Sequence, residues 1–273
     1  MPESSILVQN NLSQLLKLAL DAGKAILEVY ATAFSVELKE DHSPLTLADK
    51  RSNEILCNGL SKIGGIPIMS EEMKQLPYEE RKSWESFWLV DPLDGTKEFI
   101  KRNGEFTVNI AIIDRNDPVF GLIYVPVTGQ FYYALKGQGS YTFSTSDSNT
   151  IPKEFNEIIA KSKRLPIEHR PLGEFNIVAS RSHMSAKTEA YINAEKSKYP
   201  VVNIVSAGSS LKFCLVAEGK ADAYPRFGPT MEWDTGAGHI IATETGKKLV
   251  RCDTMDVLTY NKPNLLNPDF LVF

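Results

Sequence analysis

The order of apolar and polar positions predicts helices and strands along the whole chain. Leucine, isoleucine and alanine recur at helical spacing from Leu12 to Tyr30, which predicts an amphipathic helix. A short extended piece from Phe34 to Lys39 follows, and His42-Ser43-Pro44 predicts a turn. Thr46 can then cap a second helix that reaches about Ile63.

Strand patterns dominate the rest of the first half, where about five strands are expected. The last three of these resemble an antiparallel meander, because Pro and Gly residues separate them. The predicted strands are Ile66 to Ser70, Phe87 to Val90, Thr107 to Asp114, Val119 to Val127 and Phe131 to Leu135.

The second half alternates between strand and helix patterns, which favours α/β layering. Its predicted strands are 176–179, 201–205 and 221–224, and its predicted helices are 186–196, 209–218 and 235–245. Polar residues cluster from Ser144 to Glu174, which makes this stretch the best candidate for a junction. We therefore expect two halves, residues 1–150 and 151–273.

Composition and charge narrow the classes of protein. The chain has 273 residues, with 34 acidic and 30 basic side chains and a net charge of −4. No basic block stands out, which argues against a nucleic-acid polymer as partner. Three scattered cysteines argue against a disulfide framework. We see no signal peptide and no run of about 18 apolar residues for a membrane helix, so a cytoplasmic location is expected.

Three acidic clusters carry the candidate chemistry. Ser70-Glu71-Glu72 and Asp91-Pro92-Leu93-Asp94-Gly95-Thr96 each follow a predicted strand, and Glu232-Trp233-Asp234 opens a predicted helix. Carboxylates at strand ends can converge at one edge of a sheet, and Mg²⁺ prefers oxygen ligands. Thr96 offers a hydroxyl and an N–H group that suit a phosphate.

Each cluster also has a plain structural interpretation. Asp-x-x-Asp-Gly is common in turns, where Asp and Gly serve the local backbone. Asp234 before a helix is typical of an N-terminal cap, and Asp49 is typical of a first-turn helix acid. Only the combination of the clusters favours a metal site, and it does not identify the reaction.

The motifs resemble a known family. Trp88 to Thr96 and Glu232 to Gly238 are similar to the two signatures of the inositol monophosphatase superfamily. The segments 97–111, 208–219 and 224–230 resemble its 3'(2'),5'-bisphosphate nucleotidase branch, of the bacterial CysQ type. The resemblance implies an α+β fold, a layered αβαβα sandwich of the sugar-phosphatase type, whose two closely packed halves meet at the site.

The resemblance also implies a metal site. One Mg²⁺ would be held by Glu71, Asp91 and the Leu93 carbonyl, and a second by Asp91, Asp94 and Asp234. Glu71, Leu93, Asp94 and Asp234 would thereby also form part of the substrate site. Two such cations clamp both oxygens of an in-line displacement.

Further positions receive roles from the same resemblance. Asp49 is associated with a third, weaker metal or its water. Thr96, backed by Glu72 or Asp49, would orient the attacking water and take its proton. The N–H groups of Gly95 and Thr96 would bind the phosphoryl oxygens.

Substrate choice is implied at other positions. His183, Ser209, Lys212 and Arg226 would surround a nucleotide and its second phosphate, although a lone histidine such as His183 is often structural. The implied substrate is adenosine 3',5'-bisphosphate, cleaved to AMP and phosphate, with phosphoadenylyl sulfate as a second substrate. This reaction recycles a by-product of sulfate assimilation, and inhibition by lithium is expected.

Several alternatives stay open. A related phosphatase would act on inositol monophosphate or fructose 1,6-bisphosphate, although the segment 208–219 argues against it. A non-catalytic phosphonucleotide-binding protein is the second alternative. Glu232 departs from many relatives, and it is either an outer acid of the site or points away. The oligomer, monomer or homodimer, stays open, as does peripheral attachment to the inner face of the cell membrane.

Overall fold

A seven-stranded mixed sheet forms the first half of the protein in the computed structural model, which describes residues 3–38, 44–168, 173–179 and 185–273. The strand order is β3-β4-β5-β6-β7-β8-β9, in which β3 and β4 are parallel and every other pair is antiparallel. The strands are β3 Ile68–Ser70, β4 Ser86–Asp94, β5 Thr107–Asp114, β6 Asp117–Val125, β7 Gln130–Leu135, β8 Gly139–Ser144 and β9 Lys163–Arg164.

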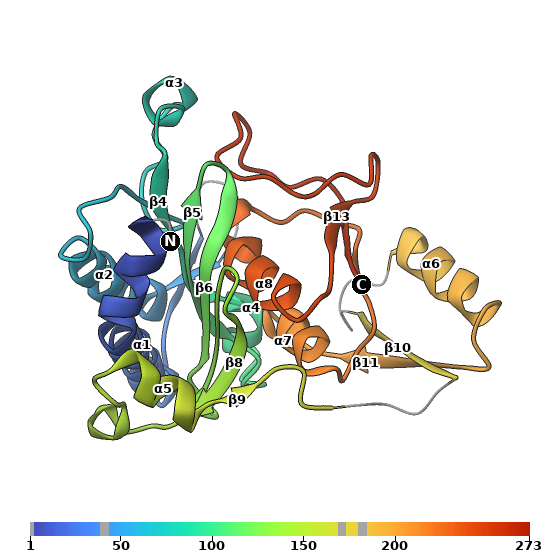
Figure 1. Cartoon of the computed structure of the whole chain (residues 1–273), viewed down its shortest axis with the longest axis horizontal. Coiled ribbons are helices and arrows are strands. Elements are labelled where there is room, and N and C mark those ends of the chain that lie inside the picture. Colours follow the sequence, from blue (N-terminus) through green and yellow to red (C-terminus); the bar gives the residue numbers. More distant parts are fainter. Residues whose placement is uncertain (1–2, 39–43, 169–172, 180–184) are drawn as a thin grey trace.

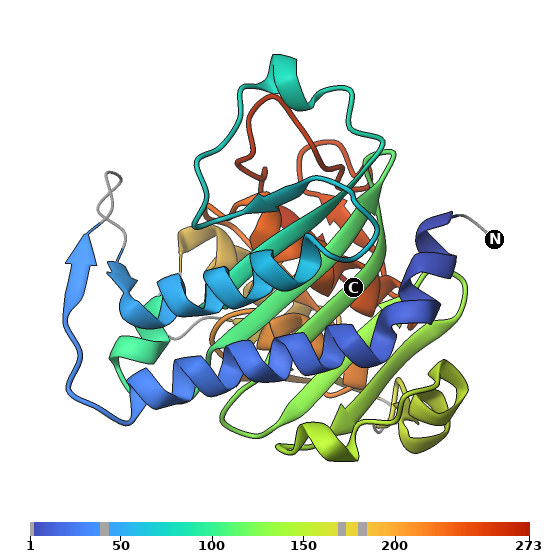
Figure 2. The same ribbon diagram turned by 90° about the vertical axis from the view of Figure 1, so that its left-hand side faces the viewer.

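Both faces of this sheet are covered, and for this reason the central strands are almost entirely buried. α1 (Glu3–Tyr30) and α2 (Leu47–Leu60) lie side by side across one face, as Figure 2 shows. α1 begins before the predicted Leu12, because Val8 continues its buried stripe. α8 (Glu232–Thr243) packs on the opposite face with α7 (Leu211–Glu218) beside it (Figure 1).

The second half adds two more layers. β10 (Glu174–Ala179) pairs in parallel with β11 (Val201–Ser206), and β14 (Phe270–Val272) lies between β12 (Tyr224–Arg226) and β13 (Leu249–Arg251). A bridge between Ile177 and Ala223 joins the two groups of strands. α6 (Ala186–Lys196) lies outside them. The layers therefore alternate as helix, sheet, helix, sheet and helix, which confirms the predicted αβαβα sandwich.

Short elements complete the chain. They are β1 Val36–Leu38, β2 Pro44–Thr46, α3 Tyr78–Arg81, α4 Thr96–Ile100, the 3₁₀ turn Ser148–Thr150 and α5 Phe155–Lys161. α5 packs on α1, and β9 pairs with β8, so the first sheet continues past residue 150. The division at residue 150 stays a prediction. Within the described ranges, no helix combines the length and apolar character needed to cross a membrane.

Two hydrophobic cores hold the layers together. One lies between α1, α2 and the first sheet, and it includes Leu16, Trp88 and Phe120. The other lies between the opposite face of that sheet, α7, α8 and the strands β12 to β14, and it includes Phe213 and Phe270. The sheets and helices are therefore fixed against one another on both sides of the acidic clusters.

Candidate active site

The three acidic clusters of the sequence meet at one edge of the first sheet. β3 and β4 are parallel and pair Ser70 with Val90, so Glu71, just past the end of β3, lies beside Asp91, which is inside β4 where its bulge begins. Asp234 reaches them from the first turn of α8. Glu71, Asp91 and Asp234 each offer a carboxylate oxygen, and these oxygens lie within 4.8 Å of one another. Such a cluster could hold a metal ion.

Asp91 is the deepest member of the cluster. Its Oδ1 atom accepts a hydrogen bond from the Leu93 N–H group at 3.1 Å. Its Oδ2 atom is buried and has no hydrogen-bond partner in the described part of the chain. Burial raises the pKa of Asp91 well above its ordinary value, and the nearby Glu71, Asp94 and Asp234 raise it further. A buried carboxylate oxygen without a partner is costly, and a bound cation would satisfy it.

Asp234 has two kinds of contact. Its Oδ2 atom accepts a hydrogen bond from the N–H group of Met231, the N-cap residue of α8, at 2.8 Å, because Asp234 is the third residue of the helix and reaches back to its start. Burial raises the pKa of Asp234 to about 8, with further contributions from Asp94 and Glu71. The prediction that Asp234 precedes the helix as its N-terminal cap is wrong, because α8 begins at Glu232; Asp234 lies in the first turn, where it both bonds to the helix start and joins the acidic cluster.

A bulge in β4 places the remaining residues of the central motif. The pairing with β5 shifts between Asp91 and Asp94, and Gly95 then adopts a φ of 90°, which suits glycine. The Thr96 hydroxyl lies 3.1 Å from Asp49 Oδ1 and 3.3 Å from the Leu93 carbonyl oxygen. The structure thus brings Asp49, Leu93 and Thr96 together.

Asp49 also joins the start of α2 to the site. Its Oδ2 atom accepts hydrogen bonds from the Thr46 N–H group at 2.7 Å and from the Thr46 hydroxyl at 2.6 Å. Burial raises the pKa of Asp49, against the effect of these hydrogen bonds. Neither Asp49 nor Glu72 is among the residues that line the adjacent cavity, and Asp49 reaches it through its contact with Thr96.

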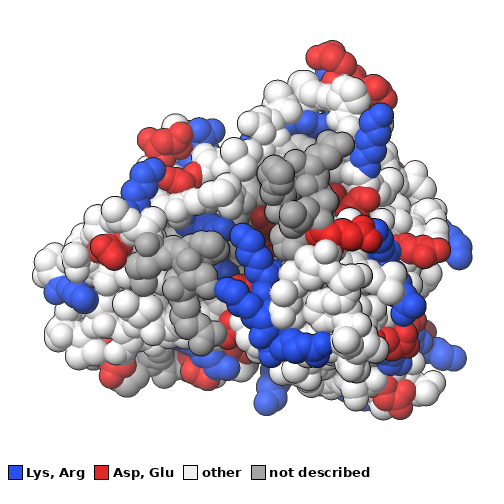
Figure 3. Space-filling view, turned by 180° about the vertical axis from the view of Figure 1, so that it is seen from behind, with Lys and Arg blue, Asp and Glu red and all other residues white. Residues whose placement is uncertain are grey.

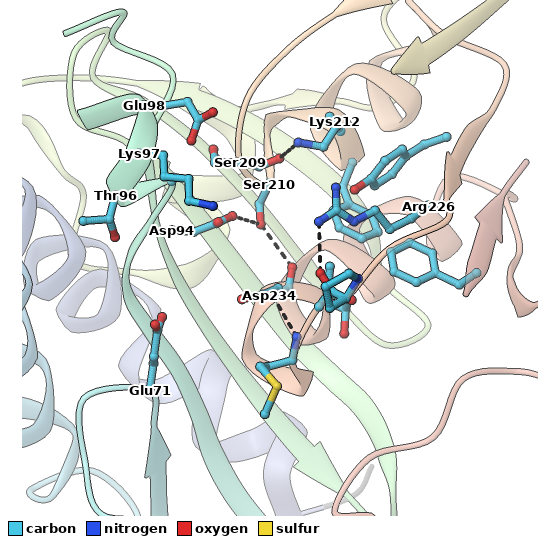
Figure 4. A pocket seen from close by; sticks show the side chains of 18 of the residues that line it. Glu71, Asp94, Thr96, Lys97, Glu98, Ser209, Ser210, Lys212, Arg226 and Asp234 are labelled. Carbon is cyan, nitrogen blue, oxygen red and sulfur yellow. Dashed lines mark hydrogen bonds between the residues drawn. The ribbon is translucent and has the colours of Figure 1, made fainter. Parts of the chain in front are cut away.

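A cavity of about 470 Å³ opens beside the acidic cluster. Glu71, Asp94 and Asp234 lie on one side of it, and Lys212 and Arg226, here called the cationic wall, lie across from them (Figure 4). Seen from behind in Figure 3, Lys and Arg side chains gather along the middle of the molecule. The cavity therefore presents groups of opposite charge to one ligand.

The two residues of the cationic wall differ in burial, because Lys212 is buried and Arg226 is only partly buried. Lys212 is only 7% exposed, and its ammonium group donates to the Ser209 carbonyl oxygen at 2.8 Å. Burial lowers the pKa of Lys212 to about 8. Arg226 donates to the Pro229 carbonyl oxygen at 3.0 Å, while its buried Nε atom has no partner among the described residues. A phosphate or other anion would satisfy that group.

The structure describes three of the four residues that were predicted to surround the nucleotide. Ser209 lines the cavity together with Lys212 and Arg226. His183 lies outside the described residues. Sequence reasoning missed Ser210, which also lines the cavity and contacts Asp94. Its position next to Ser209 in Gly-Ser-Ser-Leu-Lys was the only signal for it.

Glu232 points away from the acidic cluster. Its carboxylate is fully buried and accepts hydrogen bonds from the N–H groups of Asn261 and Lys262 at 2.7 and 2.9 Å. The Lys262 ammonium group completes the arrangement at 2.6 Å. The question left open by the sequence is thereby answered: Glu232 fastens α8 to the C-terminal loop.

Clustered carboxylates at a sheet edge, facing a cationic wall within a layered αβαβα sandwich, are typical of a phosphatase. The sequence profile described as Inositol monophosphatase family matches residues 8–269. This chain belongs to the inositol monophosphatase family, as its motifs predicted.

Individual relatives support the same family assignment. The 3'(2'),5'-bisphosphate nucleotidase CysQ of Salmonella typhimurium is 41% identical over 264 residues, which cover 96% of this chain and 98% of that protein. The crystal structure of CysQ from Bacteroides thetaiotaomicron has 45% identity and a TM-score of 0.87, and the match covers 96% of this chain and 97% of that one. The suhB structure from Bartonella henselae, at 21% identity and a TM-score of 0.71, shares the fold. The expectation of a phosphatase of this family is confirmed.

Proposed function

We propose that this protein is a Mg²⁺-dependent 3'(2'),5'-bisphosphate nucleotidase that hydrolyses adenosine 3',5'-bisphosphate to AMP and phosphate. The observation that carries the proposal is the single cavity that joins the acidic cluster to the cationic wall. Relatives at 41% identity are named for this activity. We extend the proposal to phosphoadenylyl sulfate as a second substrate.

The donor set fits Mg²⁺. Glu71, Asp91 and the Leu93 carbonyl would hold one ion, and Asp91, Asp94 and Asp234 a second, all through the oxygen ligands that Mg²⁺ prefers. The unpartnered Oδ2 atom of Asp91 supports this assignment, because it lacks a donor in the described part of the chain. Bound Mg²⁺ would supply positive charge that lowers the pKa of a water and offsets charge on the phosphoryl group.

Thr96 and Asp49 would handle the proton of the attacking water. The carboxylate is the stronger acceptor of the Thr96 proton, so the hydroxyl hydrogen points to Asp49 at 3.1 Å. The lone pairs of the hydroxyl oxygen then remain available to accept a hydrogen bond from a water in the cavity. A proton lost by that water could pass through Thr96 to Asp49, whose pKa is raised by burial.

The cationic wall supports a substrate with two separated phosphates. One phosphate would lie at the acidic cluster with its metals, next to the N–H groups of Gly95 and Thr96. The other would lie at Lys212 and Arg226, where an Arg suits bidentate contact with phosphate oxygens. A monophosphate such as inositol monophosphate would leave the cationic wall without an anionic partner, with backbone carbonyl oxygens, such as those of Ser209 and Pro229, as acceptors. The cavity of about 470 Å³ falls within the usual range of 300–1,000 Å³ for small-molecule sites.

The test is phosphate release from adenosine 3',5'-bisphosphate in Mg²⁺, measured beside inositol monophosphate and fructose 1,6-bisphosphate. We expect turnover that EDTA abolishes and Li⁺ inhibits, with kcat/KM for the nucleotide at least about tenfold above either sugar phosphate, roughly 1.4 kcal/mol. A tenfold preference for a sugar phosphate would refute the proposed substrate. Nucleotide binding without any phosphate release would refute the proposed catalysis.

A further inference from the structure

A buried hydroxyl lies between the acidic cluster and the cationic wall. Ser210 is 1% exposed, and its Oγ atom donates to Asp94 Oδ2 at 2.6 Å, the short distance typical of a hydroxyl bound to a carboxylate. Figure 4 shows this contact, with Ser209 and Lys212 on the same turn. Ser210 therefore contacts Asp94, a proposed metal ligand. It does so from the same turn that carries Ser209 and Lys212, the proposed substrate contacts.

The neighbouring side chains fix the direction of this hydrogen bond. Asn109 Nδ2, which can only donate, lies 2.9 Å from Ser210 Oγ. The Thr107 hydroxyl lies 3.0 Å from Asn109 Oδ1, which can only accept, so the orientation of the amide is set. Since the Ser210 hydroxyl accepts a hydrogen bond from Asn109, its own hydrogen does not point to Asn109 and is donated to Asp94.

Ser210 lies at the start of α7, and its hydroxyl does not cap that helix. Its backbone is helical, with a φ of −71° and a ψ of −2°, whereas a residue whose side chain caps a helix is typically extended. No such side-chain cap bond is present at this helix start. The hydroxyl instead bonds to Asp94, with the Asp234 carbonyl oxygen 3.2 Å away as a weaker, uncharged alternative.

The turn that carries Ser210 is held tightly against the first half. A Cβ atom added at Gly208 would lie 2.7 Å from Glu98 Cγ and 2.9 Å from the Glu105 carbonyl oxygen. Gly208 therefore allows an approach that a larger residue would prevent. The distance between Ser210 and Asp94 is thus set by packing on both sides of the contact.

We propose that Ser210 is a positioning residue that orients the Asp94 carboxylate for the metal and couples the α7 turn to the metal site. This inference rests on the proposed function, since it assigns Asp94 to a metal. Ser210 and Asn109 both contact the Oδ2 atom of Asp94, at 2.6 and 3.4 Å, so Oδ1 is the oxygen that would face a cation. Hydrogen bonds of this kind to a metal-bound carboxylate typically change metal affinity or activity by about 10–100-fold.

The test compares Ser210→Ala with Ser209→Ala, which removes a hydroxyl from the adjacent residue of the same turn. Metal-stripped protein is titrated with Mn²⁺, another ion that favours oxygen ligands, and free Mn²⁺ is followed by electron paramagnetic resonance. We expect Ser210→Ala to weaken Mn²⁺ binding by about 10–100-fold. Ser209→Ala should leave Mn²⁺ affinity within about twofold and instead raise KM for the nucleotide.

A double-mutant cycle separates positioning from general damage. If Ser210 acts through Asp94, Ser210→Ala should change Mn²⁺ affinity by less than about twofold in protein that already carries Asp94→Asn. Asn109→Ala provides a second variant. It removes the group that donates to Ser210 and a longer contact of its own with Asp94 Oδ2 at 3.4 Å, but it keeps the Ser210 hydroxyl, so it should weaken Mn²⁺ binding less than Ser210→Ala does.

The outcomes separate this inference from the proposed function. If wild-type protein binds Mn²⁺ and releases phosphate, but Ser210→Ala matches Ser209→Ala in metal affinity, the role of Ser210 is refuted. Equal losses from Ser210→Ala with and without Asp94→Asn refute it as well. Wild-type protein that neither binds Mn²⁺ nor releases phosphate overturns the proposed function, and the inference with it.

Discussion

Removing the Glu232 carboxylate should destabilise the protein far more than removing a more exposed carboxylate with similar hydrogen bonds. Glu232 accepts from two backbone N–H groups and one ammonium group and has no solvent exposure. Arg81 extends the arrangement, because its guanidinium donates to Asn261 Oδ1 at 2.6 Å. Glu232→Ala would leave the N–H groups of Asn261 and Lys262 buried without acceptors.

The magnitude follows from these contacts. Each buried N–H group that loses its acceptor costs about 1–3 kcal/mol, and breaking a buried ion pair costs about 3–5 kcal/mol. Lys262 is 20% exposed at its side chain and can turn to water, which limits the ion-pair contribution. We expect Glu232→Ala to lower the free energy of unfolding by about 3–5 kcal/mol, or Tm by on the order of 10 °C.

Glu244→Ala is the matched control. Glu244 also accepts from two backbone N–H groups, those of Gly137 and Gly139, both at 2.9 Å, but it is only half-buried. Water can replace its carboxylate, so the expected loss is about 1 kcal/mol. Urea unfolding of both variants, followed by circular dichroism, measures the difference.

Metal affinity and turnover provide a second measurement on the Glu232 variants. Because Glu232 faces the C-terminal loop, Glu232→Gln should lower Tm while Mn²⁺ affinity and kcat/KM stay within about twofold of the wild type. A Glu232→Ala loss no larger than that of Glu244→Ala would refute the reasoning from burial. A tenfold loss of Mn²⁺ affinity in Glu232→Gln at unchanged Tm would return Glu232 to the metal site.

Four further outcomes are expected. Asp94→Asn should abolish phosphate release while circular dichroism shows an intact fold; near-normal turnover would contradict its metal role. Thr96→Val should lower kcat by about 100-fold or more, because it removes the hydroxyl that orients water, and a change in KM alone would count against that role. The pKa of Lys212 is lowered to about 8 in the folded protein, so its side chain loses its charge above pH 8 and KM for the bisphosphate should rise above that pH. Lys212→Arg keeps its charge at these pH values and should therefore show no such increase in KM. Gly121→Ala should lower the free energy of unfolding by about 1–3 kcal/mol or more, because the new Cβ atom would collide with the Ala237 carbonyl oxygen in α8. An unchanged midpoint of urea unfolding would show that α8 can shift.

The acidic cluster was predictable because its residues follow directly from local patterns. Glu71 and Asp91 each follow an apolar run in the sequence, and the parallel pairing of β3 with β4 brings them side by side, although β4 continues through Asp91 to Asp94. Asp234 opens a helix with a clear periodic pattern. The layered fold was predictable for the same reason, since each main helix and strand has its own periodicity.

Other features depend on contacts between distant parts of the chain. Ser210 meets Asn109, which lies 101 positions earlier, and no local pattern fixes that distance. The direction of Glu232 is set by Asn261 and its neighbour in the C-terminal loop. The short strands β13 and β14 were not predicted, since each has only three residues and takes its partners from distant segments.

Three helices, α2, α7 and α8, begin at the site. Polar residues at their starts can serve the helix, the site or both, so the sequence alone could not separate a capping role from a functional one. Asp49 caps α2 with one oxygen and contacts Thr96 with the other. Asp234 accepts from the backbone at the start of α8 and joins the acidic cluster. Ser210 makes no side-chain cap bond at α7 and donates to Asp94. Helix starts supply short polar side chains on a fixed backbone, which places these three side chains at the site. An acid in the first turn of a helix can therefore bond to the helix start and face the site at the same time, and the sequence does not separate the two roles.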